Sequence, residues 1–182
     1  MDQLDTSARV PPIETALVDA VRALSSRLDV GGVAHTLLAA LHDLFGARSA
    51  WVLLEDDAQR RLHTIACPGP HGDAFRDVVM PVDAGIMGLA FSSRQVVFVP
   101  DVQADDRWFN AARVHRTGMR SAVAVPLVCD GRARGVVGLD APSLADGRLP
   151  HLADRTRLEA LAAQAAVAFA NAERYEACER DR

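Results

Sequence analysis

The chain has 182 residues, of which 49% are hydrophobic, and its formal net charge at pH 7 is −4. This length and hydrophobic fraction predict one domain with a substantial core. Acidic residues are interspersed with the arginines, so the chain lacks the positive field that gathers nucleic acid or an anionic membrane surface. We therefore expect a soluble, cytoplasmic protein whose partners include neither nucleic acid nor membrane.

Two helices are expected before the first strand. Residues 1–11 are polar and are expected to be flexible. After Pro11 and Pro12, apolar residues recur three or four positions apart from Ile13 to Leu28, which predicts an amphipathic helix. Asp29 is the expected cap of a second helix that ends near Gly46.

The middle of the chain reads as short strands separated by turns and one short helix. Apolar runs at 50–54 and 62–67 predict a hairpin, and strands are expected at 78–82 and 96–99 with a short helix at 83–91 between them. Residues 101–118 have no sustained period and predict a long loop, a kind of segment that often carries function. A second hairpin is expected from strands at 121–129 and 133–140, followed by a polar link at 141–150.

The last segment, 151–177, is the clearest helix of the chain. Its apolar residues repeat alternately three and four apart, which is typical of a coiled-coil seam: Leu158, Leu161, Ala165, Ala168, Ala172 and Tyr175. This pattern predicts a homodimer formed through the terminal helices. Residues 178–182 are interpreted as the helix end or as the start of a connection to an output domain.

Five phrases in order resemble the GAF domain over residues 13–177. They are Gly85-Ile-Met-Gly-Leu-Ala-Phe, Val97-Phe-Val-Pro-Asp-Val, Gly118-Met-Arg-Ser-Ala-Val-Ala-Val-Pro-Leu, Arg134-Gly-Val-Val-Gly-Leu-Asp and Leu161-Ala-Ala-Gln-Ala-Ala-Val-Ala-Phe-Ala-Asn-Ala. The resemblance implies an α/β (α+β) domain at 12–177, with an antiparallel sheet of about six strands. It also implies terminal helices on one face of the sheet, a small-molecule pocket on the other, and a sensory or regulatory role in a signalling protein.

The expected pocket lies between the helix at Gly85, the loop that carries Trp108 and the strand from Ser121. Glycines at a helix start let a ligand approach the backbone, although they equally permit tight helix–sheet packing. The candidate ligand-binding residues are Gly85, Ile86, Met87, Gly88, Asp101, Trp108, Phe109, Met119, Ser121, Val123 and Asp140. A ligand that prefers one arrangement of the loop is expected to reposition the C-terminal helix.

The ligand and the cofactor are not identified by the sequence. Four residues of the long loop and one at the end of the second hairpin resemble the ligand set of a non-haem iron sensor: Asp101, Asp105, Asp106 and His115, with Asp140. Loop acids also serve as ordinary turn or cap residues. His115 resembles in its placement the proximal histidine of haem-binding GAF sensors, but its neighbouring arginines are more polar than a haem face. The signatures of cyclic-nucleotide and bilin GAF domains are missing. We expect no metal site.

Catalysis is not expected, and no catalytic residue is assigned. One phrase, Gly135-Val-Val-Gly-Leu-Asp-Ala-Pro, is similar to the free methionine sulfoxide reductases, which need a pocket thiolate. Residues 83–127 contain no cysteine, because the three cysteines are Cys67, Cys129 and Cys178. The competing interpretation is a dimerisation or scaffold module with a vestigial pocket.

Overall fold

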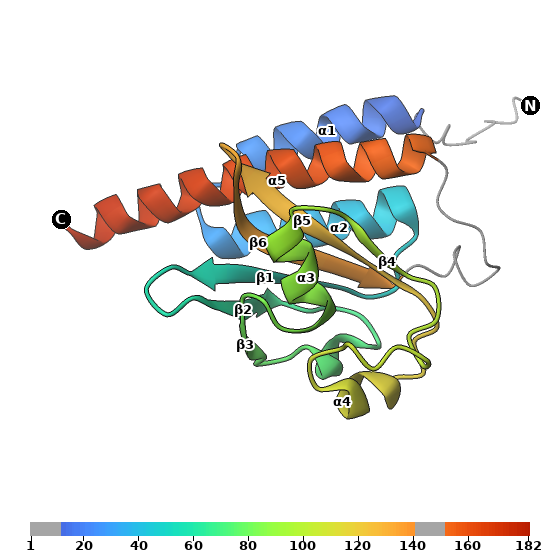
Figure 1. Cartoon of the computed structure of the whole chain (residues 1–182). Coiled ribbons are helices and arrows are strands. Elements are labelled where there is room, and N and C mark those ends of the chain that lie inside the picture. The colour runs from blue at the N-terminus through green and yellow to red at the C-terminus, as the bar shows by residue number, and fades with distance from the viewer. Residues whose placement is uncertain (1–11, 141–151) are drawn as a thin grey trace, which may run out of the picture.

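A single antiparallel sheet forms the middle layer of the protein (Figure 1). The computed structural model describes residues 12–140 and 152–182, and the strand order of its six-stranded sheet is β3-β2-β1-β6-β5-β4. The strands are β1 (Ala50–Asp56), β2 (Arg61–Ala66), β3 (Val79–Pro81), β4 (Val97–Val99), β5 (Ala122–Cys129) and β6 (Arg132–Asp140). All neighbouring strands pair antiparallel, and the two edge strands, β3 and β4, have three residues each.

The helices divide between the two faces of this sheet. The long helices α1 (Ile13–Ser25), α2 (Val30–Phe45) and α5 (Leu152–Arg180) cover one face, with α1 and α5 side by side (Figure 1). The short helices α3 (Gly85–Ser93) and α4 (Ala111–His115) and the 3₁₀ turn η1 (Gly72–Ala74) lie on the other. The expected α/β fold is confirmed. The predicted flexible N-terminus at 1–11 and the polar link at 141–150 lie outside the described residues.

Local signals place the ends of α2 as expected. The Asp29 carboxylate accepts a hydrogen bond from the Gly32 amide at 2.6 Å, which satisfies one of the free N–H groups of the first turn. Gly46 ends the helix in the left-handed conformation with φ of 66°. The first helix is shorter than its apolar pattern suggested, because Leu28 lies beyond the end of α1 and its side chain is 57% exposed.

The two-residue period of the strands sorts their side chains into two cores. In β5, Ala122 and Ala124 face the α3 side, whereas Val123 and Val125 face the long helices. In β1, Trp51 and Leu53 face the α3 side, whereas Val52 and Leu54 face the helices. Each strand therefore carries side chains of both cores, and a displacement of one strand moves side chains on both faces of the sheet.

The apolar seam of α5 is used within the chain. Leu158, Leu161, Ala165, Ala168 and Ala172 are buried in the core that α1, α2 and the sheet share. Tyr175, the last residue of the predicted seam, is exposed. The spacing identified the helix correctly, but this stripe does not form the coiled-coil contact that we expected, because a helix that packs on its own sheet needs the same apolar period.

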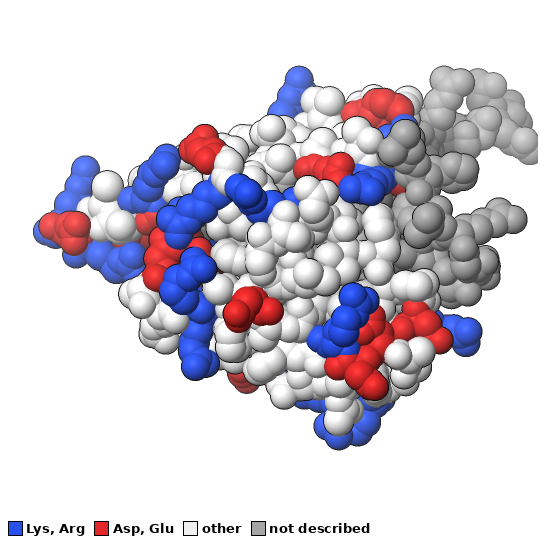
Figure 2. All heavy atoms as spheres, in the orientation of Figure 1, with Lys and Arg blue, Asp and Glu red and all other residues white. Residues whose placement is uncertain are grey.

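The surface carries charges of both signs close to one another. Figure 2 shows arginines and acidic residues interspersed on one face rather than gathered into a patch of one sign. Among the described helices, none is long and apolar enough to cross a membrane.

Candidate functional site

The α3 side of the sheet is organised around three aromatic rings, Trp51, Phe75 and Trp108, which we call the aromatic cluster. Trp51 comes from β1, Phe75 follows η1, and Trp108 comes from the loop between β4 and α4. The Phe75 ring stacks on Trp51 with a centroid distance of 3.7 Å and an interplanar angle of 5°. Trp108 meets Trp51 edge-on at 6.5 Å and Phe75 edge-on at 6.1 Å. The two edge-on contacts have the geometry that aromatic pairs prefer, whereas Trp51 and Phe75 lie nearly face to face.

The two indole N–H groups of the cluster differ in their partners. Trp51 Nε1 donates to the sulfur of Met87 on α3 at 3.4 Å. Trp108 Nε1 is buried and has no hydrogen-bond partner among the described residues. Because an indole nitrogen is only a donor, a buried one without an acceptor is costly. The cluster therefore contains one unsatisfied donor in an otherwise apolar setting.

Side chains fill the space around the aromatic cluster almost completely. The hollow that remains beside the cluster measures only about 10 Å³ and is lined by Leu53, Ala74, Phe75, Val78, Met80, Met87, Trp108 and Phe109. A space of this size holds about one water molecule at most. The open ligand pocket that we expected is therefore closed in the described part of the chain, because the aromatic rings occupy it.

The candidate residues of α3 contribute backbone packing and apolar contacts. Gly85 has φ of 64°, and a Cβ placed on it would lie 2.6 Å from the Phe109 nitrogen. A Cβ on Gly88 would lie 2.5 Å from the carbonyl carbon of Asp83. Gly85 thus lets the loop carrying Trp108 and Phe109 close against the start of α3, and Gly88 lets the chain before α3 pack against the helix. Ile86 and Met87 are buried in the same core as the aromatic cluster.

The other candidates do not lie together. Met119 joins the core of the aromatic cluster, and Ser121 is buried just before β5. Asp101 is exposed and accepts hydrogen bonds from the amides of residues 103 and 104, at 3.0 and 3.3 Å, as an ordinary turn residue. Val123 lies on the opposite face, in the core of the long helices. The prediction chose the wrong face for Val123, since the side of a strand depends on register.

Asp140 belongs to a polar cluster at the end of β6, together with Arg48, Ser49 and His71. Its Oδ1 accepts hydrogen bonds from the backbone amides of Arg48 and Ser49, at 2.6 and 2.9 Å. Its Oδ2 lies 3.6 Å from Arg48 Nε and 3.8 Å from His71 Nε2, and its side chain is 3% exposed. Asp140 thus fastens the connection between α2 and β1 and is not part of the aromatic cluster.

The loop between β4 and α4, which holds the loop acids of the alternative iron site, contains paired charges. Asp105 forms a salt bridge with Arg107 at 2.6 Å, and this hydrogen bond holds the pKa of Asp105 below its usual range. His115 Nε2 lies 3.2 Å from the Asp105 carbonyl oxygen. Among the described residues, no group of three histidine, cysteine or acidic side chains is placed to hold a metal ion. The alternative iron set therefore does not assemble.

The three cysteines are free and lie far from a common site. Cys67 packs against the core of the aromatic cluster, whereas Cys129 packs against the core of the long helices. Cys178 is exposed near the end of α5. Burial raises the pKa of Cys67, and burial together with the neighbouring Asp130 raises the pKa of Cys129. Neither environment activates a thiolate.

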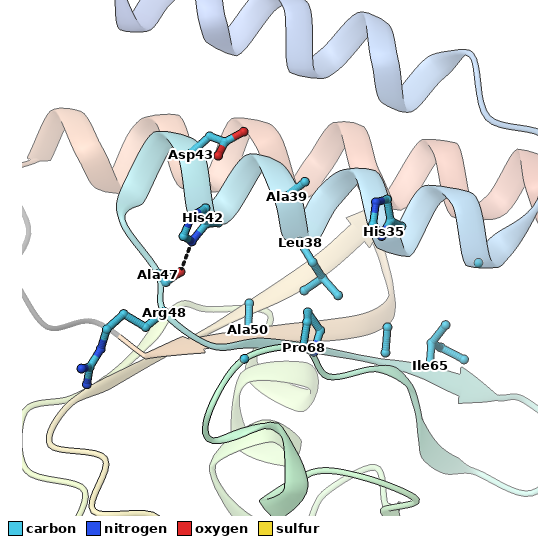
Figure 3. A pocket seen from close by; sticks show the side chains of 13 residues that line it. His35, Leu38, Ala39, His42, Asp43, Ala47, Arg48, Ala50, Ile65 and Pro68 are labelled. Atoms are coloured by element: carbon cyan, nitrogen blue, oxygen red, sulfur yellow. Dashed lines mark hydrogen bonds between the residues drawn. The ribbon is translucent and has the colours of Figure 1, made fainter.

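A groove that sequence reasoning missed runs between α2 and the end of β2 (Figure 3). Its volume is about 660 Å³, and its lining includes Leu38, Ala50, Ile65 and Pro68. His42 at its rim is hydrogen-bonded through Nδ1 to the Ala47 carbonyl at 2.9 Å. The groove arises where α2 leaves the end of β2 uncovered, an arrangement that depends on packing rather than on local pattern.

Comparisons with known proteins agree with this architecture. A model of the GAF domain family matches residues 27–170. The structure is similar to the GAF domain of a phosphoenolpyruvate-protein phosphotransferase from Acinetobacter, with 16% identity, a TM-score of 0.73, and 92% of this chain and 99% of that chain covered. It is also similar to residues 122 to 287 of a methyl-accepting chemotaxis protein, with 28% identity, a TM-score of 0.67, and coverage of 84% and 96%.

A third similar structure is the free methionine-R-sulfoxide reductase from Neisseria meningitidis in complex with its substrate. It shares 24% identity and a TM-score of 0.68, with 89% of this chain and 90% of that chain covered. Comparison with curated proteins found no significant match.

Proposed function

The chain belongs to the GAF domain family, and we propose that it serves as the sensory or regulatory domain of a cytoplasmic signal-transduction protein. A small ligand binds at the aromatic cluster, and α5 relays binding to a partner copy and to an output domain. The observation that carries this proposal is that the side chains of β5 and β6 alternate between the two cores of the domain.

The relay begins where the aromatic cluster meets the sheet. Trp51 pairs with Gly138 of β6, and a Cβ on Gly138 would lie 2.3 Å from the indole ring. The neighbouring β6 residues Val137 and Leu139 point to the other face, where they share a core with α5. Because close-packed cores transmit small displacements, a movement of the Trp51 ring reaches α5 through one strand.

Helix α5 is placed to carry such a movement outward. Near its C-terminal end, Glu173 pairs with Arg134 of β6, and Glu176 accepts a hydrogen bond from the Val30 amide of α2 at 2.8 Å. Beyond these contacts the helix extends past the body of the domain (Figure 1). A change in β6 therefore acts on α5 close to the point where it leaves the domain.

The dimer contact that we propose uses the outer surface of α1 and α5. Val18 of α1 and Val167 and Tyr175 of α5 are between 42% and 49% exposed although they are large and apolar. Exposed apolar residues on two neighbouring helices favour contact with a second copy. Apart from Tyr175, the exposed last residue of the predicted seam, this surface is distinct from the buried seam of α5.

A fluorescence experiment tests the ligand step directly. The chain has two tryptophans, and both belong to the aromatic cluster, so their emission reports on this site without background. Titration with nucleotides, aromatic acids and neutral aromatics, each paired with a thermal melt, is expected to give one class that shifts the emission and raises the melting temperature.

The relay step is tested by spin labels. In a Cys67→Ser, Cys129→Ser variant, a label on the exposed Cys178 is expected to give a distance between two copies that changes with the active ligand. As a control, Val167→Glu is expected to abolish the distance signal and to retain the tryptophan response. A wild-type chain that stays monomeric at high concentration in light scattering contradicts the dimer.

The filled aromatic cluster favours one second candidate, a dimerisation or scaffold module with a vestigial pocket. Dimerisation without a tryptophan response or thermal shift for any ligand class supports this second function. In either case we propose that the domain is not an enzyme, since its cysteines do not share a site. If the domain turns over methionine sulfoxide with a thiol donor and Cys67→Ser abolishes this activity, the proposal that the domain is not an enzyme is wrong.

A further inference from the structure

Phe75 fills the centre of the aromatic cluster from an irregular segment rather than from the sheet. The segment between β2 and β3 holds η1 and is fastened by local bonds, such as Phe75 N–H to the Gly72 carbonyl at 2.9 Å. It is also tied to β2, where the Thr64 hydroxyl donates to the Phe75 carbonyl at 2.7 Å. The segment is also held from outside by two hydrogen bonds, from the His71 amide to the Ser49 hydroxyl and from the Arg113 guanidinium to the Asp73 carbonyl. None of these bonds involves the Phe75 side chain, so the ring itself is held by packing, whereas Trp51 is fixed within a paired strand.

The walls around the Phe75 ring are those of a site for a flat molecule. Trp51 forms the floor at 3.7 Å, and Trp108 closes one edge. The hollow beside them is lined entirely by apolar side chains, so a charged guest would lose its hydration without compensation. The buried Trp108 Nε1 lacks an acceptor among the described residues and is the unsatisfied hydrogen-bond donor of the cluster.

We propose that Phe75 is an internal plug, held in the place of an uncharged, planar aromatic ligand that carries a hydrogen-bond acceptor for Trp108 Nε1. This inference rests on the proposed function, because it names the ligand class of the same site. The ligand displaces the Phe75 ring, stacks on Trp51 and satisfies the Trp108 indole. The plug lowers the apparent affinity by the fraction of molecules in which the ring is out.

Coumarin and naphthalene are suitable probes, since both are flat, neutral and bicyclic and only coumarin carries a carbonyl acceptor. Two-dimensional ¹⁵N–¹H spectra resolve the indole N–H signals of Trp51 and Trp108. Coumarin is expected to bind the wild-type protein weakly and to move the Trp108 signal downfield, as a new hydrogen bond does. Naphthalene is expected to bind more weakly and to leave that signal without a downfield shift.

Removing the plug provides the decisive comparison. Phe75→Leu, which keeps apolar volume but loses the flat ring, and Phe75→Ala are each expected to bind coumarin about tenfold or more tightly than the wild type. Phe91→Ala is the matched control, because Phe91 is buried in the same core but is not stacked on Trp51. It is expected to leave coumarin affinity unchanged.

Three outcomes overturn the inference: no coumarin binding to the wild-type protein, equal affinities in the Phe75 and Phe91 variants, or binding without a change at Trp108. A charged ligand that alone shifts the tryptophan emission and the Cys178 distance overturns this inference and leaves the proposed function intact. Coumarin binding that obeys all the expectations above, with no ligand class moving α5, supports the plug and contradicts the relay.

Discussion

Gly138→Ala is predicted to destabilise the domain through the floor of the aromatic cluster. Gly138 stands opposite Trp51 across the β1–β6 pair, and a Cβ there would lie 2.3 Å from two atoms of the indole. The ring has no room to retreat, since Phe75 is stacked on it at 3.7 Å and Trp51 is fully buried. The added methyl group therefore forces the ring, the strand or the stacked pair out of place.

The expected cost follows from this crowding. Overpacking a well-filled core typically costs about 1–3 kcal/mol, and we expect the upper half of this range because both faces of the ring are blocked. For a chain of this size, each kcal/mol lowers the melting temperature by about 2–4 °C. Urea unfolding followed by tryptophan emission measures the free energy of unfolding directly.

A second glycine serves as the control for this substitution. A Cβ on Gly31, in the first turn of α2, would lie 3.4 Å from the Asp29 carboxylate, which is an ordinary contact. Gly31→Ala is expected to stabilise the protein by a few tenths of a kcal/mol up to about 1 kcal/mol, because alanine favours the helix. A cost below about 0.5 kcal/mol for Gly138→Ala would refute the reasoning, since surface changes reach that size.

Three further predictions concern other parts of the fold. Asp29→Ala removes the cap of α2 and is expected to cost about 0.5–2 kcal/mol in chemical unfolding, whereas Asp29→Ser retains most of the stability. Asp140→Ala leaves the buried Ser49 amide and the partly buried Arg48 amide without this acceptor and is expected to cost about 1–3 kcal/mol, of which Asp140→Asn recovers part. Equal losses in both variants would contradict this role. The pKa values of Cys67 and Cys129 are raised, so at pH 8 each forms less thiolate than free cysteine does. In single-cysteine variants, each thiol is therefore expected to react with iodoacetamide more slowly than free cysteine, and its reaction rate is expected to rise only at higher pH.

Local chemistry explains why most elements of the fold were predictable. Asp29 and Gly46 mark the ends of α2 in the sequence because capping and the left-handed turn are decided by neighbouring residues. The hairpin of β5 and β6 was visible from the turn at Asp130 and Gly131, both of which have positive φ. The phrases that resemble the GAF domain placed these elements in the correct order around a six-stranded sheet.

The candidate site was less predictable, because its key contacts join distant segments. Trp51 reads as one residue of an apolar run, and nothing near it in the sequence indicates that Phe75 will stack on it. The η1 turn that delivers Phe75 is three residues long and has no periodic signal. Trp108 was named correctly as a member of this face, but its neighbours were assigned to an open pocket, since residue types alone do not reveal how completely side chains fill a space.

The outermost strands of the sheet bear on how the domain behaves at high concentration. An exposed strand edge invites a foreign strand to add to it, which is the first step toward fibrils. Here each edge offers only three residues, and the β3 edge includes Pro81, which has no amide hydrogen to donate. We therefore expect crowded copies of this domain to meet through helices and to resist the growth of amyloid from its margins.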